Sequence, residues 1–223
     1  MSKKKVLELF AGSRSIGKVA DELGYDCFST DINSFLDIDL VKDIADLNKK
    51  DIPFIPDIIW ASPVCSAWSK TGWFHYWDTK VYSNSKLFVA KKEFAKESIE
   101  MIRKTIEIFS WFPNAVFFME NPQGLLYRHP VINNFVTYGL SNNLKRHLIT
   151  YCQYGDNIMK PTHLWTNSNI FMPKRCNKGD SCHESSPRGT MTGIRKKKNS
   201  YERSKMPYKL CLEILQLISP TKQ

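Results

Sequence analysis

A cysteine and a glutamate stand where two predicted strands end, and both side chains can do chemistry. Cys65 lies in the segment SPVCSAWS, shortly after the apolar run 56–61, and Glu120 directly follows the apolar run 115–119. In an open α/β sheet, the carboxyl ends of the strands line the crevice that binds ligands. A thiol that attacks a ring and a carboxyl group that protonates it can share one substrate there. The simpler alternatives are a buried structural cysteine and a surface acid.

A third strand end carries the pattern of a nucleotide-like cofactor site. The apolar run 4–9 leads into a turn that contains Gly12, and a helix is predicted from about 16 to 23. Gly12 permits a close approach of the backbone, and the helix N-terminus behind it offers free N–H groups. Asp31 stands 19 positions after Gly12, at the end of the predicted strand 27–30, where its carboxylate can accept hydrogen bonds from ribose hydroxyls. The glycine pattern alone also fits a plain tight turn, and Asp31 favours the cofactor site.

The elements that must position these residues predict an α/β domain. Strand-length apolar runs alternate with helical patterns at 87–109 and 207–218, which is typical of a mixed, mostly parallel sheet with helices on both faces. The stretch 167–200 is rich in Asn, Ser, Gly, Pro and Lys, which predicts a short loop-rich insert. We therefore expect a catalytic domain at 1–166, the insert at 167–200, and a C-terminal segment at 201–223 that returns to the domain.

Composition limits the class of protein and its partners. The chain of 223 residues is long enough for one well-buried domain, and no apolar run approaches the ~20 residues of a membrane span. Six cysteines at irregular spacing, with no secretory signal, predict reduced thiols in the cytoplasm. A net charge of +10 and the basic run 195–198 favour a nucleic-acid partner, although a solvated lysine-rich surface is the alternative.

The chain resembles the DNA (cytosine-5)-methyltransferases, and more specifically their compact phage and bacterial members. The cysteine motif at 62–69 and MENPQGLL at 119–126 are its specific motifs. The other matching stretches follow the family's order: FAGSRSIG at 10–17, Asp31, Asp43-Ile44, CQYG at 152–155, KPTHLWTN at 160–167 and YERSKMPYKLC at 201–211. The resemblance implies a Rossmann-like class I methyltransferase fold, S-adenosylmethionine as cofactor and double-stranded DNA as substrate. It also implies a monomer in the cytoplasm of a bacterial or phage-infected cell.

The resemblance assigns roles to individual residues. Cys65 would add to C6 of a cytosine flipped out of DNA, and Glu120 would stabilise this adduct at N3 while C5 takes the methyl group. The residues implied at the cofactor are Phe10, Gly12, Ser13, Gly17, Asp31, Ile32, Asp43, Ile44, Ser62 and Pro63. Those implied at DNA are Ser69, Gln153, Lys160, Thr162, Arg195, Lys196 and Lys197.

Two departures from the family pattern concern charge. The family's Gln-x-Arg-x-Arg segment reads QYGDN from Gln153, without either arginine, and Lys160 is the candidate for the missing cation. Arg14 lies close to the site implied for S-adenosylmethionine. Its charge leaves open that a derivative of S-adenosylmethionine, rather than S-adenosylmethionine itself, donates the group that is transferred to cytosine. Methylation of RNA cytosine, or DNA binding without catalysis, are the alternative functions.

Two segments carry further expectations. The aromatic-rich stretch 70–86 predicts a mobile lid that closes on DNA, with packing against the domain as the alternative. Cys176, Cys182 and His183 suggest zinc, but the cysteine spacing is unusual and no fourth ligand is obvious. We therefore expect no metal.

Overall fold

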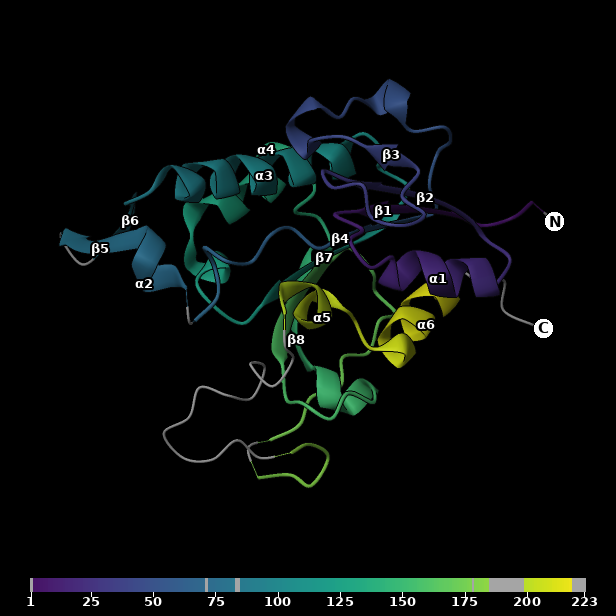
Figure 1. The fold of residues 1–223 in the computed structure, drawn as a ribbon. Coiled ribbons are helices and arrows are strands. Elements are labelled where there is room, and N and C mark those ends of the chain that lie inside the picture. The colour runs from purple at the N-terminus through teal and green to yellow at the C-terminus, as the bar shows by residue number, and fades with distance from the viewer. Residues whose placement is uncertain (1, 71, 83–84, 178, 185–198, 218–223) are drawn as a thin grey trace.

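A single seven-stranded sheet organises the molecule (Figure 1). The computed structural model describes residues 2–70, 72–82, 85–177, 179–184 and 199–217. The strand order is β3-β2-β1-β4-β7-β9-β8. These strands are β1 (Lys5–Leu9), β2 (Asp26–Asp31), β3 (Leu40–Val41), β4 (Ile58–Ala61), β7 (Val116–Pro122), β8 (Lys145–Thr150) and β9 (Pro161–Thr166). The four pairings among β3, β2, β1, β4 and β7 are parallel, and β9 pairs antiparallel with both β7 and β8, so the predicted mixed, mostly parallel sheet is confirmed.

The order of the strands reverses direction at β1. The chain builds β1, β2 and β3 outward, then returns to place β4 on the other side of β1. In register, Leu9 pairs with Ala61 and Ala61 pairs with Met119, so β1, β4 and the corresponding part of β7 reach the same level. A reversal of this kind leaves a ligand crevice at the carboxyl ends of the strands.

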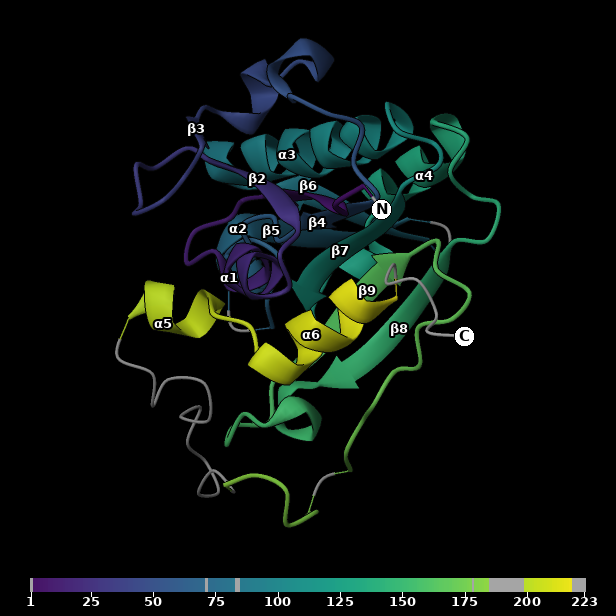
Figure 2. The ribbon, with the colours of Figure 1, turned by 90° about the vertical axis from the view of Figure 1, so that its right-hand side faces the viewer.

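Helices cover both faces of the sheet (Figure 2). On one face lie α3 (Glu93–Ser110) and α4 (Asn134–Thr137), and on the other lie α1 (Ser15–Glu22) and α6 (Tyr208–Gln216). Successive strand residues serve opposite faces, as Leu7 and Leu9 pack in the cluster with α3 while Val6 packs in the cluster with α1 and α6. Among the described residues, none of the helices combines the length and the apolar character that a membrane crossing requires.

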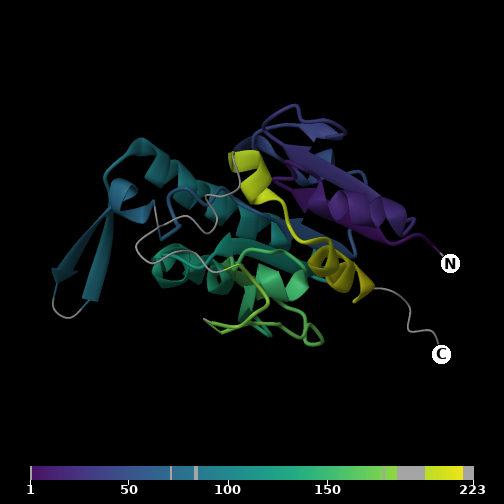
Figure 3. The same ribbon diagram turned by 60° about the horizontal axis from the view of Figure 1, so that its bottom comes forward.

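The stretch expected to form a lid is largely structured. It contains α2 (Trp73–Tyr76), and β5 (Trp77–Tyr82) pairs with β6 (Ser85–Ala90) in a separate hairpin that projects from the body (Figure 3). Trp77 is fully buried, and its indole N–H donates to the carbonyl of Ala67 at 2.8 Å. Trp77 thus shows the alternative given for this stretch, packing against the domain, because its side chain inserts into the core. The helix predicted from 87 is also shorter, since 87–90 belong to β6.

The strand that carries Glu120 is longer than its sequence suggests. From the sequence we placed Glu120 directly after a strand at 115–119, whereas β7 continues through Pro122 because β9 supplies an antiparallel partner, with Glu120 opposite Leu164. Proline is tolerated at the end of a strand, where its missing N–H interrupts no inner rung of the ladder. Glu120 consequently lies within β7 and pairs with β9, one residue beyond the last residue of β7 that pairs with β4.

A buried carboxylate caps the first helix. Glu8 in β1 accepts hydrogen bonds from the backbone N–H groups of Ile16 at 3.0 Å and Gly17 at 2.9 Å. Burial raises the pKa of Glu8 to about 7, although both N–H groups and the Arg14 charge favour its ionised form. A methyl group on Gly17 would lie 2.9 Å from Glu8 Oε2 and 3.0 Å from Arg14 Nε. The absence of a side chain at Gly17 thus allows this packing.

Gly17→Ala is expected to destabilise the fold. Crowding of this kind costs about 1–3 kcal/mol, which outweighs the ~1 kcal/mol that alanine contributes in a helix interior. Urea unfolding followed by circular dichroism measures the change. Lys18→Ala, on the exposed side of the same helix, is the control and should change stability by less than ~0.5 kcal/mol. A Gly17→Ala protein as stable as the native chain would contradict this account of the packing.

Candidate active site

Cys65 lies in a tight turn after β4. Its carbonyl oxygen accepts hydrogen bonds from the N–H groups of Trp68 at 3.0 Å and Ser69 at 2.9 Å. Trp68 is fully buried and packs against Trp77, with their ring centroids 5.0 Å apart. This aromatic anchor holds the end of the turn, while Cys65 itself stays half-buried. The turn therefore presents a thiol from a fixed backbone.

Glu120 is a buried carboxylate with two polar partners. Only 6% of its surface is exposed. The phenol of Tyr151 donates to Glu120 Oε1 at 3.1 Å, and Lys160 Nζ lies 3.5 Å from the same oxygen. Lys160 Nζ also lies 4.5 Å from the centroid of the Tyr151 ring. A buried charge is costly unless it is paired, and this triad supplies the pairing.

Asn121 joins the two motifs. Its side-chain amide donates to the carbonyl of Pro63 at 3.1 Å, and the residue is fully buried. Pro63 stands two residues before Cys65, so the hydrogen bond ties the cysteine turn to β7 next to Glu120. The turn that carries Cys65 is thereby linked to the strand that carries Glu120.

The charges around Cys65 act on it in opposite directions. Burial raises the pKa of the Cys65 thiol above its usual range, the positive charge of Lys160 lowers it, and the negative charge of Glu120 raises it. The pKa of Tyr151 is raised well above its usual value, chiefly by burial and then by Glu120. Tyr151 therefore stays a neutral donor, and Cys65 rests as a thiol at neutral pH.

The turn after β1 lies at the same edge of the sheet as the turn that carries Cys65. Phe10, Gly12 and Arg14 all adopt positive φ angles, of 55°, 49° and 53°. Non-glycine residues in this region are uncommon and gather at functional sites. The Asp31 carboxylate accepts hydrogen bonds from the N–H groups of Gly12 at 3.0 Å and Asn33 at 2.9 Å. Asp31 is therefore oriented at the strand end and remains half-buried.

Among known proteins, this chain is similar to DNA methyltransferases. No protein-family model matches the chain. A probable DNA (cytosine-5)-methyltransferase of Frog virus 3 (isolate Goorha) is 26% identical over 181 residues, which cover 80% of this chain and 77% of the viral protein. The predicted resemblance to the DNA (cytosine-5)-methyltransferases is confirmed.

Solved structures confirm the methyltransferase fold. A "putative DNA modification methyltransferase" encoded within an E. coli prophage matches with a TM-score of 0.53 at 13% identity, over 74% of this chain and 46% of its own. The Dnmt2 methyltransferase of S. pombe matches with a TM-score of 0.50 at 13% identity, over 80% of this chain and 52% of its own. The chain thus spans about half the length of these two structures.

The remaining residues that the methyltransferase resemblance implies at the cofactor lie around the same strand ends. Ile32, just after Asp31, exposes 61% of its surface, whereas Ile44 is buried. Asp43 caps a short turn by accepting from the N–H of Ala45 at 2.9 Å. The Ser62 hydroxyl accepts from the indole N–H of Trp60 at 2.7 Å, and the Ser13 hydroxyl lies 2.9 Å from that of Ser15. Pro63 and Gly17 are buried in the contacts described above.

The residues implied at DNA divide into three groups. Ser69 is half-buried beside the cysteine turn, but Thr162 is fully buried and has no surface with which to contact a ligand. Lys160 lies in the site itself, at Glu120, and Gln153 donates to Cys182 Sγ at 3.2 Å. Arg195, Lys196 and Lys197 lie outside the described residues.

Sequence reasoning missed Tyr151 and the joining role of Asn121. Asn121 stands inside the MENPQGLL motif, so its position was a usable signal. Tyr151 directly precedes CQYG, but its contact with Glu120 spans 31 positions and follows only from the β7-β9-β8 pairing. Arg203 also belongs here, because its carbonyl lies 3.5 Å from Lys160 Nζ.

The reactivity of Cys65 toward iodoacetamide is expected to rise with pH and to reach half its maximum above the ~8.5 of a free thiol. Burial causes this shift, and Glu120 adds to it. Glu120→Gln keeps the shape of the side chain but removes its charge, so the inflection should move down. Mass spectrometry of the peptide that contains Cys65 measures the rate. Cys27, whose pKa is raised to about 12, is the internal control and should react more slowly.

An inflection at or below 8.5 in the native chain would contradict the expected dominance of burial. An inflection that does not move in Glu120→Gln would contradict the placement of Cys65 and Glu120 in one site.

Proposed function

We propose that this protein is an S-adenosylmethionine-dependent methyltransferase that methylates C5 of cytosine in double-stranded DNA, acting as a monomer. The observation that carries the proposal is the junction of a nucleophile and a buried acid through the hydrogen bond between Asn121 and Pro63. Residues 1–166 and 201–223 would form the catalytic part, and 167–200 the part that recognises the target.

The crevice beside β1 fits the cofactor. Asp31 is an oriented carboxylate for ribose hydroxyls, and the exposed apolar side chain of Ile32 follows it, suited to an adenine ring. Phe10 and Gly12, both with positive φ angles, form the turn that leads from β1 to the N-terminus of α1. S-adenosylmethionine, when bound, supplies an electrophilic methyl group.

Cys65 and Glu120 would activate the base together. A cytosine must leave the duplex stack for its ring to be reached. The Cys65 thiolate then forms a bond to C6, and the electron pair of the C5–C6 double bond moves into the ring. Glu120 would first take up a proton from water and then donate it in a hydrogen bond to N3, which stabilises this pair and makes C5 nucleophilic. After methylation, water takes the C5 proton, the electron pair of the C5–H bond re-forms the C5–C6 double bond, and Cys65 leaves C6 as the thiolate.

The two partners of Glu120 would prepare it for this role. Tyr151 fixes the carboxylate by a hydrogen bond, and Lys160 supplies the positive charge beside it. Lys160 also favours the thiolate of Cys65, which is the nucleophilic form. We infer that Lys160 takes the place of the arginines that the family's Gln-x-Arg-x-Arg segment would provide.

Expression of this protein in cells is expected to produce 5-methylcytosine in their DNA, measured by nucleoside mass spectrometry. Cys65→Ala should abolish the product, because no other group replaces the nucleophile. Glu120→Gln should lower the rate about 10²–10⁴-fold, the usual contribution of a positioned acid. Cys27→Ser, outside the crevice, is the matched control and should keep full activity.

Each other outcome points away from the proposal. Methylation of a matched RNA but not of DNA would move the activity to RNA, whose 2′-hydroxyls change the helix form. Unmodified nucleic acid together with retained binding of S-adenosylmethionine would identify a catalytically silent relative. A modified cytosine heavier than 5-methylcytosine would support Cys65 as the nucleophile but would show that the transferred group comes from a donor other than S-adenosylmethionine.

The covalent step is testable separately with duplex DNA that contains 5-fluorocytosine. Fluorine at C5 cannot leave as a proton does, so the bond from Cys65 to C6 should persist. In the presence of S-adenosylmethionine, the native chain is expected to form a denaturant-resistant complex with this DNA, and Cys65→Ala should form none. Methylation without a trapped complex would contradict the proposed covalent route.

A further inference from the structure

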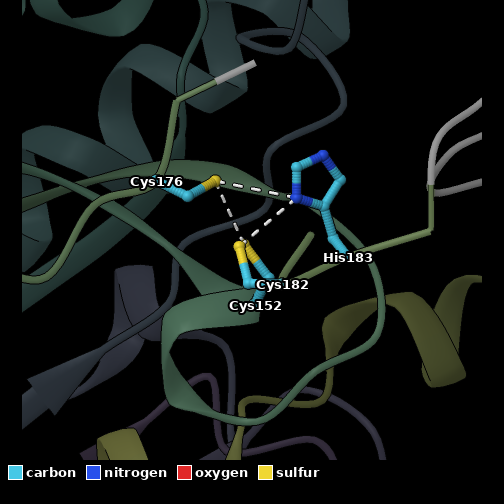
Figure 4. Close-up of side chains that lie close together, drawn as sticks. All are labelled: Cys152, Cys176, Cys182 and His183. Atoms are coloured by element: carbon cyan, nitrogen blue, oxygen red, sulfur yellow. Dashed lines mark hydrogen bonds between the residues drawn. The ribbon is translucent and has the colours of Figure 1, made fainter. Parts of the chain in front are cut away.

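Three cysteines and a histidine converge outside the candidate active site (Figure 4). The side chains of Cys152, Cys176, Cys182 and His183 point toward a common centre, and their ligand atoms all lie within 4.8 Å of one another. From the sequence we expected no metal, because Cys176, Cys182 and His183 lacked a fourth ligand. The fold supplies Cys152, which stands 24 positions before Cys176.

The four residues come from two segments that meet at the edge of the sheet. Cys152 belongs to a 3-10 turn, η5 (Tyr151–Tyr154), directly after β8. The other three belong to the first half of the loop-rich insert. Cys152 and Cys176 are buried, and Cys182 and His183 are half-buried. The cluster therefore joins the insert to the catalytic sheet.

The distances match those of a tetrahedral metal site. Cys152 Sγ lies 3.3 Å from Cys176 Sγ and 3.7 Å from Cys182 Sγ. His183 Nδ1 lies 3.5 Å from Cys182 Sγ and 3.8 Å from Cys176 Sγ. Four ligands at the bond lengths of zinc would stand about 3.7 Å apart for two sulfurs and about 3.5 Å apart for sulfur and nitrogen. The side chains thus need only small adjustments to bind one ion.

The surrounding hydrogen bonds hold the ligands in place. Gln153 Nε2 donates to Cys182 Sγ at 3.2 Å, a contact that suits a thiolate. The backbone N–H of Cys176 donates to the Thr150 hydroxyl at 2.8 Å, and the N–H of Glu184 donates to the carbonyl of Asn157 at 2.9 Å. The insert is thus attached to the η5 region on both sides of the cluster.

We propose that Cys152, Cys176, Cys182 and His183 bind one zinc ion that fixes the insert to the catalytic sheet. Three cysteines and a histidine complete a tetrahedral set and leave no open position, which is the pattern of a structural site. The insert is poor in apolar residues, and a metal supplies the folding energy that a small segment without a core lacks. Three soft thiolates select zinc over magnesium or calcium.

A disulfide is the competing use of two of these cysteines. The sulfurs of Cys152 and Cys176 lie 3.3 Å apart, well beyond the ~2.05 Å of a bond. A disulfide would also leave Cys182 and His183 without a shared role, whereas a metal uses all four. The distances therefore favour zinc over oxidation.

The full chain, purified without chelator under reducing conditions, is expected to contain one zinc ion per molecule by elemental mass spectrometry. Cys182→Ser and His183→Ala should lower the zinc content to less than half. Cys27→Ser is the matched control and should keep the full content, since Cys27 lies in β2. Cobalt exchanged into the native site should give the thiolate charge-transfer absorption of a tetrahedral centre, and Cys182→Ser should lose it.

Several results would overturn the proposal. These are a native chain that neither contains zinc nor takes it up in titration, a Cys182→Ser variant with full zinc content, or a Cys152–Cys176 disulfide in the protein as isolated. Limited proteolysis separates a local from a global effect, because Cys182→Ser should expose the insert to cleavage while the sheet stays folded. Metal content does not depend on methylation, so this test stands even if the proposed activity fails.

Discussion

The buried ion pair between Glu120 and Lys160 is the interaction on which the site depends. Glu120 lies on β7 and Lys160 directly precedes β9, so the antiparallel pairing of these strands brings the charges together. Removing two charges from water is costly, and the Tyr151 hydrogen bond helps to offset that cost. Lys160 in turn acts on the Cys65 thiol. One pair of charges thus governs the acid and the nucleophile at once, and a change to either partner alters both.

The turn after β1 is built on the same principle of a buried charge with fixed partners. Glu8 turns toward the α1 N-terminus, where two backbone N–H groups complement its carboxylate. This contact sets where α1 begins, and the positive φ angles of Phe10 and Arg14 are accommodated between the strand and the helix. The strain at these residues persists because the strand and the capped helix hold both ends of the turn.

The sequence predicted what depends on local pattern and missed what depends on pairing between distant strands. Apolar runs identified β1, β4 and most of β7, and with them the positions of Cys65 and Glu120 at one edge of the sheet. The continuation of β7 through Pro122 could not be foreseen, because it depends on β9, about 40 residues farther along the chain. The contacts of Tyr151 and Cys152 were hidden for the same reason. The burial of Trp77 was not foreseen either, because the whole aromatic-rich stretch was interpreted as a lid, whereas this side chain inserts into the core.

The short turn η5 links the site to the insert. Tyr151 and Cys152 are consecutive, yet Tyr151 contacts Glu120 while Cys152 faces the cluster of cysteines. In a single 3-10 turn, neighbouring residues point in different directions, so one rigid element serves two environments. Tyr154 adds a third contact, since its phenol accepts from the N–H of Lys174 in the insert at 3.0 Å. The insert contacts η5 through Cys152 and Tyr154, so a displacement of the insert would pull on the backbone of Tyr151, which lies in the same turn. Because Tyr151 donates a hydrogen bond to Glu120, the position of the Glu120 carboxylate depends on how the insert is anchored.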